Sequence, residues 1–194
     1  MGAPINVNPI QIDITNDQSV DHCFKAIEQH FGRLDILINN AGTAGADLVR
    51  AAGDPSPREI WSHVYDVNVI STGLVTETMI PLLQHSQKPK IIFITSDLGS
   101  MGLVLKNGKS AAPQVPWYSS SKTAVNMLTL HYATQYPKFK VNACNPGLVA
   151  TAIHSENQEG EGDPALGAVN AVRLATEVDG ETGTFTQTEG PIPW

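Results

Sequence analysis

Tyr118 and Lys122 lie four residues apart in the segment PWYSSSKTAVNML (116–128), which has the pattern of a helix. Residues four apart share one face of a helix, so the Lys122 ammonium can lie beside the Tyr118 phenol. An isolated phenol loses its proton at about pH 10, and a neighbouring cation favours the phenolate. The pair is therefore a candidate acid–base centre that could protonate a carbonyl or deprotonate an alcohol.

Two more polar residues are candidates for the same site. Ser96 follows the apolar run KIIFITS (90–96), and its hydroxyl could hold a substrate oxygen. Asn68 lies inside a long helical pattern. Each signal has an ordinary explanation when taken singly, because YxxxK occurs by chance in helices, Ser96 could cap a turn, and Asn68 could be a locally bonded polar residue.

The elements that must position these residues alternate along the chain. Helical patterns separate short β-rich runs, and the final strand follows the last helix. The predicted strands are 8–14, 35–38, 90–96, 139–147 and 183–187, and the predicted helices are 16–34, 57–86, 118–136 and 165–177. The segments 99–117 and 148–163 read as loops. This order predicts one α/β domain over 1–194, a Rossmann-like doubly wound parallel sheet of about five strands, with ligands at the carboxyl ends of the strands.

Composition excludes several classes of function. The formal net charge of -7 leaves no basic stripe for a nucleic-acid backbone. No run of 18 apolar residues and no secretory leader pattern occur, so no membrane association is expected. The two cysteines, Cys23 and Cys144, have no CxxC or His-rich company. We expect a reduced, cytoplasmic protein without a metal site.

With its motifs in order, the sequence resembles the short-chain dehydrogenase/reductase family along essentially the whole chain. The motifs that carry the resemblance are Asp13 in IDITND, NNAG (39–42), NVISTG from Asn68, ITSDLGS with Ser96 three residues before a glycine, YSSSK with Tyr118 and Lys122, and NPGLVAT (145–151).

The resemblance implies a role for each matched residue. Tyr118 would be the acid/base, Ser96 would bind the substrate oxygen, and Asn68 would position a water that relays protons. Lys122 would lower the proton affinity of Tyr118 and hold the ribose of NAD(P). Hydride would pass between this cofactor and a ketone or secondary alcohol. The implied cofactor-binding residues are Asp13, Ile14, Asn40, Ala41, Gly42, Pro146, Gly147, Val149 and Thr151.

The sequence departs from the family at the phosphate-binding turn. The family begins with a strand, a TGxxxGxG turn and a helix whose N–H groups hold the pyrophosphate. Here the run at 8–14 already matches the third strand, and no GxGxxG or GxxxGxG spacing occurs. No cofactor is therefore expected to bind with normal affinity, although NAD(P) is expected if the family's function is retained.

The same departure raises a question about the sheet, because the family's two missing strands lie between its third and fourth. A buried strand does not tolerate unpaired backbone groups. We predict that the strand 8–14 pairs directly with the strand 35–38, or that a second chain fills the gap.

Three functions from different classes follow. The first, which we prefer at this stage, is redox-independent proton transfer such as dehydration, isomerisation or cyclisation. The second is a nicotinamide-dependent oxidoreductase that binds its cofactor unusually or is a fragment of a longer chain. The third is a catalytically silent scaffold.

Apolar residues suggest the class of substrate and the oligomeric state. Candidate substrate-binding residues are Met101, Leu103, Trp117, Leu148 and Ile153, which favour a small apolar ketone-like molecule over a sugar phosphate. We predict a homo-oligomer that pairs through the helices 57–86 and 118–136, using Trp61, Val64, Leu74, Val75, Met79, Met127, Leu128 and Leu130.

Overall fold

A computed structural model describes residues 7–52, 54–108, 115–149, 153 and 162–194 of the chain. Its centre is a sheet of order β1-β2-β3-β4-β5. The strands β1 (Ile36–Asn39), β2 (Lys90–Ile94), β3 (Lys140–Cys144) and β4 (Phe185–Gln187) run parallel, whereas β5 (Gly190–Pro191) is antiparallel to β4. This confirms the predicted α/β, Rossmann-like sheet.

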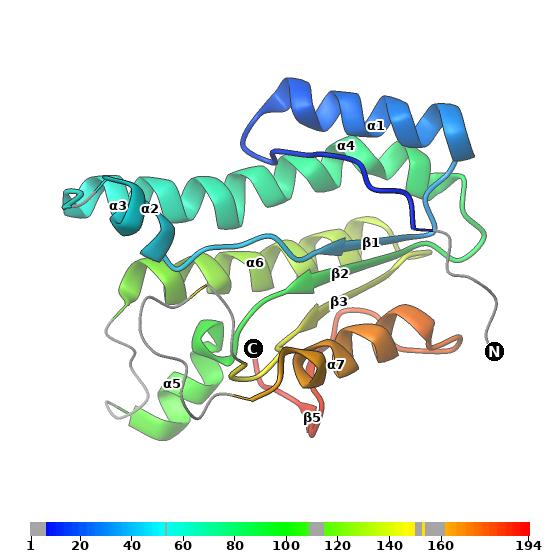
Figure 1. Cartoon of the computed structure of the whole chain (residues 1–194). Coiled ribbons are helices and arrows are strands. Elements are labelled where there is room, and N and C mark those ends of the chain that lie inside the picture. The colour runs from blue at the N-terminus through cyan, green and yellow to red at the C-terminus, as the bar shows by residue number, and fades with distance from the viewer. Residues whose placement is uncertain (1–6, 53, 109–114, 150–152, 154–161) are drawn as a thin grey trace.

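Helices cover both faces of this sheet (Figure 1). The helices α1 (Asp17–Phe31), α4 (Thr72–Gln84) and α6 (Pro116–Gln135) pack on one face, against Ile91, Phe93 and Val141. The helix α7 (Pro164–Thr176) packs on the other face, against Ile92 and Cys144. Successive side chains of β2 therefore enter opposite cores, which explains why KIIFI is a continuous apolar run.

The helix boundaries follow from local capping. The side chain of Asn16 accepts a hydrogen bond from the Ser19 N–H at the start of α1, and Gly32, with φ of 66°, ends it. The helix α3 (Pro57–Tyr65) begins with a reciprocal capping box between Ser56 and Glu59.

The predicted long helix 57–86 is continuous but not uniform. Between α3 and α4 the chain passes through a π-helical segment, η1 (Asp66–Ser71), which contains Asn68. Such π-helical turns change the direction of side chains within a helix and are frequent at functional sites.

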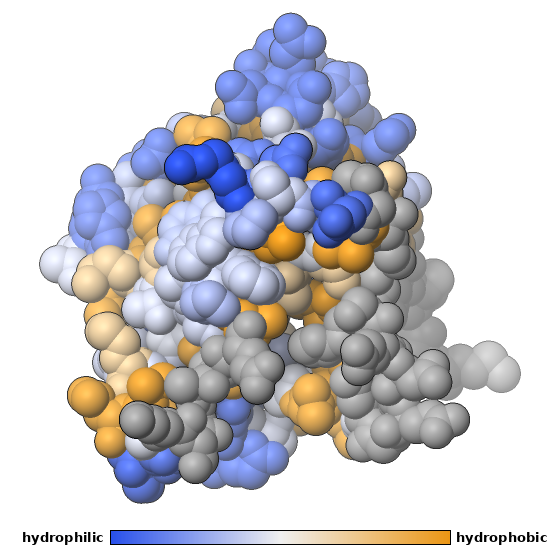
Figure 2. Space-filling view, turned by 90° about the vertical axis from the view of Figure 1, so that its left-hand side faces the viewer, coloured by the Kyte–Doolittle hydropathy of each residue, from blue (hydrophilic) through white to orange (hydrophobic). Residues whose placement is uncertain are grey.

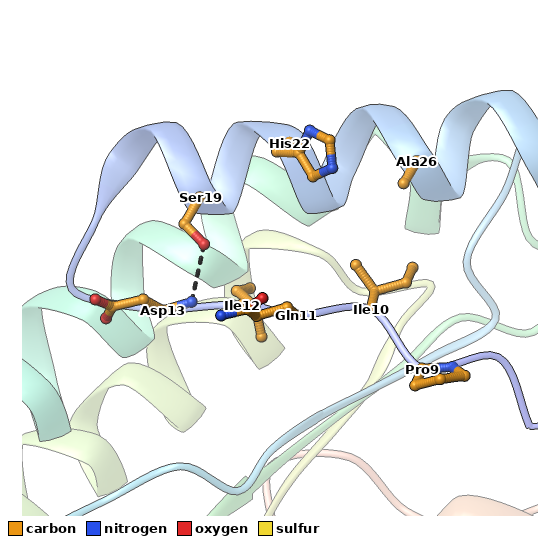
Figure 3. Close-up of a pocket in the computed structure, with 8 residues that line it drawn as sticks. All are labelled: Pro9, Ile10, Gln11, Ile12, Asp13, Ser19, His22 and Ala26. Carbon is orange, nitrogen blue, oxygen red and sulfur yellow. Dashed lines mark hydrogen bonds between the residues drawn. The ribbon is translucent and has the colours of Figure 1, made fainter.

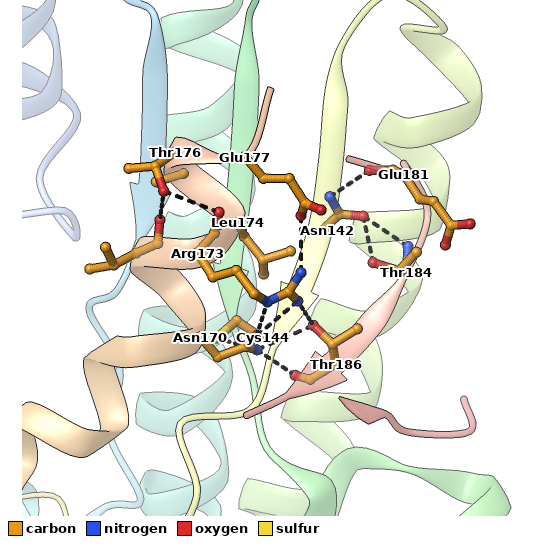
Figure 4. Close-up of polar contacts among 12 residues, drawn as sticks. Asn142, Cys144, Asn170, Arg173, Leu174, Thr176, Glu177, Glu181, Thr184 and Thr186 are labelled. Carbon is orange, nitrogen blue, oxygen red and sulfur yellow. Dashed lines mark hydrogen bonds and ion pairs between the residues drawn. The ribbon is translucent and has the colours of Figure 1, made fainter. Parts of the chain in front are cut away.

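A polar network attaches α7 to the far side of the sheet (Figure 4). The Asn170 Nδ2 group donates to the Thr186 carbonyl at 3.0 Å, and Arg173 donates from Nη2 to Asn170 Oδ1 at 2.9 Å and from Nη1 to Glu177 at 3.0 Å. At the C-terminal end of α7, Lys90 Nζ also donates to the carbonyls of Ala175 and Glu177 at 2.6 and 2.5 Å. The network satisfies the C-terminal carbonyls of α7 and fixes the short strand β4.

The predicted strand at 8–14 is wrong. This segment has no strand pairing, and within the described residues β2 is the only partner of β1. Instead, Ile10 and Ile14 pack against the core under α1 and α4, and the Asp13 N–H donates to Ser19 Oγ at 2.9 Å. Packing of two apolar side chains on the helices has replaced pairing of the backbone with β1. That a second chain pairs with β1 stays a prediction.

The segment 99–117, predicted as a loop, holds more regular structure than expected. A 3₁₀ turn, η2 (Asp97–Gly99), leads into the helix α5 (Met101–Asn107), and α6 begins at Pro116 rather than at Tyr118. Ser100 caps α5 by accepting from the Leu103 N–H at 3.0 Å. A second short helix, α2 (Ala46–Ala52), and the strand β5 were also not predicted.

Candidate active site

The candidate catalytic residues come from three elements at the carboxyl end of the sheet. Ser96 follows β2, Tyr118 and Lys122 lie in the first two turns of α6, and Asn68 lies in η1. All four side chains are buried. Figure 2 looks onto this end of the molecule and shows hydrophobic residues at its centre, among the polar ones.

Lys122 is the most enclosed charged group of the site, with 3% of its surface exposed. Its Nζ donates to the Ile94 carbonyl at 3.0 Å and lies 5.7 Å from the centroid of the Tyr118 ring. Burial lowers the pKa of Lys122 to about 8. In the part of the chain that is described, Ile94 is the only hydrogen-bond acceptor of this ammonium, which has three donors.

Tyr118 differs from expectation in its acidity. Its burial raises its pKa to about 12, opposed by a hydrogen bond with the Ser96 side chain and assisted by the negative charge of Asp97. The predicted lowering of the Tyr118 pKa is therefore not found in this structure, because desolvation of the phenolate is the largest effect. At neutral pH Tyr118 carries its proton.

Ser96 has a neighbour that sequence reasoning missed. Its Oγ lies 3.1 Å from Asp97 Oδ1 and accepts a hydrogen bond from the Leu98 N–H at 3.2 Å. The same hydroxyl thus caps η2 and faces Tyr118. The position of Asp97, directly after Ser96, was the one signal that could have identified it.

Asn68 is held entirely by protein atoms. Its Oδ1 accepts from the Thr43 N–H at 2.8 Å, while its Nδ2 donates to the Thr43 carbonyl at 2.8 Å and to Ser121 Oγ at 2.9 Å. Both amide protons are therefore used. The side chain has no donor left for the water that Asn68 is expected to position, so its amide acts here to hold the turn after β1.

The residues converge because two glycines let the backbone approach. A Cβ built on Gly42 would lie 3.2 Å from Asn68 Oδ1 and 3.3 Å from Lys122 Nζ. One built on Gly99 would lie 2.7 Å from the Lys122 carbonyl carbon, which no side chain allows. Asn126 supports this contact, because its Nδ2 donates to the Gly99 carbonyl at 3.1 Å and its Oδ1 accepts from Thr95 Oγ1 at 2.7 Å.

Most candidate cofactor-binding residues lie at the same end of the sheet. Asn40, Ala41 and Gly42 form an exposed turn after β1. Pro146, Gly147 and Val149 follow β3, where Gly147 has a φ of 75°. Thr151 lies outside the described residues.

Asp13 and Ile14 are placed apart from this group. Asp13 is exposed, and hydrogen bonds from the Thr15 side chain and backbone lower its pKa. A groove of about 520 Å³ beside it is lined by the segment Pro9–Asp13 and by Ser19, His22 and Ala26 of α1 (Figure 3). Among the hydrogen bonds of the described chain, none joins this groove to Lys122 or Tyr118.

The candidate substrate-binding residues differ in exposure. Met101 and Leu148 are exposed, whereas Leu103, Trp117 and Ile153 are half-buried. Trp117 is held in place, because its Nε1 donates to the Ala44 carbonyl at 3.1 Å and its ring meets Trp61 edge-on. Leu103 packs with Phe185 and Trp194. Met101, Leu103 and Trp117 therefore lie in α5 and at the start of α6, close to Ser96 and Tyr118 in the chain, whereas Leu148 and Ile153 follow β3.

Over the described ranges, no group of three or more His, Cys, Asp or Glu side chains could hold a metal ion. The same residues contain no helix with the length and hydrophobicity needed to span a membrane.

Comparison with known proteins identifies the family. The sequence model described as short chain dehydrogenase matches residues 3–162. The chain is 32% identical to the short-chain dehydrogenase/reductase tropE of Talaromyces stipitatus, covering 93% of this chain and 72% of that protein. It is 36% identical to eupG of a Phoma species, covering 88% and 67% respectively.

Solved structures agree in fold. Salutaridine reductase from Papaver somniferum superposes with a TM-score of 0.70 at 28% identity, covering 90% of this chain and 80% of that one. An NADPH-bound carbonyl reductase from chicken fatty liver superposes with a TM-score of 0.76 at 24% identity, covering 95% and 76%. The fold, the order of the motifs and these relatives together show that the chain belongs to the short-chain dehydrogenase/reductase family.

Proposed function

We propose that this chain carries an acid–base centre that transfers a proton to or from the oxygen of a carbonyl or alcohol in a small apolar molecule. The observation that carries the proposal is the buried Tyr118–Lys122 pair, with a protonated phenol that interacts with Ser96 and an ammonium 5.7 Å from the ring. Such a donor acts on a bound oxygen without requiring a charged form of its own at neutral pH.

In this proposal each side chain has one task. Ser96 Oγ binds the substrate oxygen, and Tyr118 donates its phenolic proton to that oxygen as negative charge develops there. Lys122 stabilises the phenolate that remains, because an adjacent cation is most effective in a site with little water. Asn68 and Ser121 hold the turn that faces Lys122.

The residues at this end fit the nicotinamide half of NAD(P)H. Gly42 leaves room beside a buried ammonium that has one protein acceptor, so Lys122 could hold ribose hydroxyls there. Asn40, Ala41, Pro146 and Gly147 would line the same half. NAD(P)H, when bound, would supply the hydride to the carbonyl carbon. Because relatives include proteins named as reductases, carbonyl reduction is the first function that we propose.

The residues do not provide for the pyrophosphate. The 194 residues contain no glycine-rich turn of the TGxxxGxG type. The same side chains also support a second candidate, redox-independent proton transfer such as dehydration or isomerisation, because the Tyr118 phenol and its contact with Ser96 require no dinucleotide.

Calorimetric titration with NADPH and NADH, followed by turnover with a panel of aromatic and alicyclic ketones, separates the two candidates. Micromolar binding with oxidation of NADPH supports the reductase. Absence of binding, together with exchange of the substrate's α-proton for deuterium, supports the redox-independent enzyme. If neither nucleotide oxidation nor proton exchange occurs with any ketone, both enzymatic functions fail and the scaffold hypothesis remains.

We also propose that the chain forms a homo-oligomer in the cytoplasm. Trp61, Leu74 and Met127 are exposed on α3, α4 and α6, and so is Ile70 of η1. Val64, Val75 and Met79, which the sequence placed in the same interface, are buried in the core and are not available to a partner. We expect light scattering at micromolar concentration to give at least a dimer mass and Met127→Asp to reduce it. A monomer mass for the unmodified chain would contradict the proposal.

A further inference from the structure

Outside the catalytic residues, a chain of polar contacts ends on the turn that holds Asn68. Thr43, whose amide and carbonyl clamp the Asn68 side chain, donates from Oγ1 to Asp47 Oδ1 and accepts from the Gly45 N–H at 2.9 Å. The other carboxylate oxygen of Asp47 lies 2.7 Å from His63 Nε2. Thr43 has an exposed fraction of only 6%, so its bonds are shielded from water.

These contacts tie together four elements. Asp47 lies in the first turn of α2, His63 lies in the last turn of α3, and Asn68 lies in η1. From α6, Trp117 donates to the Ala44 carbonyl at 3.1 Å. The turn at residues 43–45 is therefore held by the nearby Asp47 and by Asn68 and Trp117, which are distant in sequence.

The turn has little freedom to relax if one contact is lost. Gly45 has a φ of 94°, and a Cβ built on it would lie 3.2 Å from Ile60 and 3.4 Å from Val64. Burial acts to raise the pKa of the Asp47 carboxyl, but hydrogen bonds from Thr43 and His63 together lower it. The carboxylate is thus charged at neutral pH and accepts from both neighbours.

We propose that Thr43, Asp47 and His63 form a positioning chain that holds the 43–45 turn, and through it Asn68, in register beside Lys122. None of the three side chains touches the proposed reacting atoms, so their effect is transmitted through Asn68. An exposed ion pair alone contributes little to stability. The buried Thr43 contact distinguishes this chain from such a pair, because an unpaired buried hydroxyl is costly. The proposal rests on the proposed acid–base function and adds to it the control of geometry.

The test uses Asp47→Ala, the near-isosteric Thr43→Val and the double variant. We expect kcat to fall about tenfold in each single variant, with KM within about twofold of the unmodified value. Both single variants remove the same contact between Thr43 and Asp47. The kcat of the double variant should therefore be no more than about threefold below that of either single variant. Arg33→Ala, which breaks the exposed Arg33–Asp35 pair far from the turn, is the matched control and should leave kcat unchanged.

A second readout is independent of activity. The chain has three tryptophans, and 5-fluorotryptophan labelling gives Trp117 its own ¹⁹F resonance, assigned with Trp117→Phe. We expect this resonance to shift in Asp47→Ala and Thr43→Val and to stay in place in Arg33→Ala. Circular dichroism verifies that each variant is folded. If the unmodified chain has no activity, the proposed function fails, and the fluorine spectra alone decide on the positioning chain. Unchanged spectra in both variants, or kcat losses that multiply in the double variant, would overturn it.

Discussion

The carboxyl end of β1 and its outer edge differ in how many contacts they make with the rest of the protein. At its carboxyl end, Asn68 and Lys122 are buried and bonded to Thr43, Ser121 and Ile94. Along its outer edge, Ile36 and Ile38 are exposed, and the segment 7–15 packs on helices instead of pairing with the strand. The side chains proposed to transfer a proton are therefore brought together within the described residues.

By comparison, the region that is expected to hold the adenine side of a dinucleotide makes few contacts. Asp13 is exposed beside an open groove, and β1 has one neighbouring strand among the residues described. The contacts that hold Asn68 and Lys122 therefore form although β1 has one neighbouring strand among the described residues. The contrast between these two regions makes three measurable predictions.

The largest effect is expected at Tyr118. Tyr118→Phe removes the transferable proton and keeps the ring, so turnover should fall by about 10² to 10⁴ while folding survives. Tyr132 offers a matched control, because it lies in the same helix, is buried and has its pKa raised to about 12, chiefly by burial, yet stacks on Phe93 in the core. The measurement compares the steady-state turnover rates of Tyr118→Phe and Tyr132→Phe. Equal rates for Tyr118→Phe and Tyr132→Phe would move the chemistry away from Tyr118.

The next largest effect is the contribution of Lys122 to the pH dependence of the free energy of unfolding. Its pKa of about 8 in the folded chain lies below the usual value of 10.5, so the buried charge destabilises the native state fully below pH 8. As pH rises from 8 to 10.5 the folded chain loses this proton first, and the penalty of up to about 3 kcal/mol disappears.

Urea unfolding of the unmodified chain and of Lys122→Met at pH 8, 9 and 10 isolates this contribution, because other titrating groups are common to both proteins. The free energy of unfolding of the unmodified chain should rise relative to that of the variant. A constant difference would show that Lys122 is not buried as described.

The smallest effect is expected at the outer edge of β1. Ile38 and Ile92 are register partners on the same face of the sheet, but Ile38 is 42% exposed and Ile92 is 1% exposed. Ile92→Ala should lower the free energy of unfolding by about 2–5 kcal/mol, and Ile38→Ala by less than about 1 kcal/mol. Chemical denaturation measures both. A loss for Ile38→Ala as large as that for Ile92→Ala would indicate that a second chain covers this edge.

Sequence reasoning succeeded where the signal is local. The start of α1 was predictable because its capping residue directly precedes the helix, although the predicted end at residue 34 lies beyond Gly32, where the helix stops. The strand β2 was predictable because a continuous apolar run indicates burial on both faces. The pairing of Tyr118 with Lys122 on α6 follows from helical spacing alone. The four candidate catalytic residues, chosen in this way or through the family motifs, are all buried in the structure, and their catalytic roles stay predictions.

Sequence reasoning failed where the outcome depends on contacts with residues that are distant in the chain. An apolar alternation at 8–14 satisfies a strand and a helix-packing segment equally, and only the presence of α1 and α4 selected the second. The acidity of Tyr118 was misjudged because spacing reveals the nearby cation but not the depth of burial, which dominates.

Local sequence patterns thus established the family, most of the order of strands and helices, and the residues that could exchange a proton, since these depend on patterns within a few turns of chain. Only the tertiary structure decided how those residues are held. The clamp between Thr43 and Asn68 spans 25 positions and the bond between Thr95 and Asn126 spans 31, so neither leaves a local pattern. Desolvation, like these bonds, is a property of what packs around a group, and it therefore becomes definite only when the chain is folded.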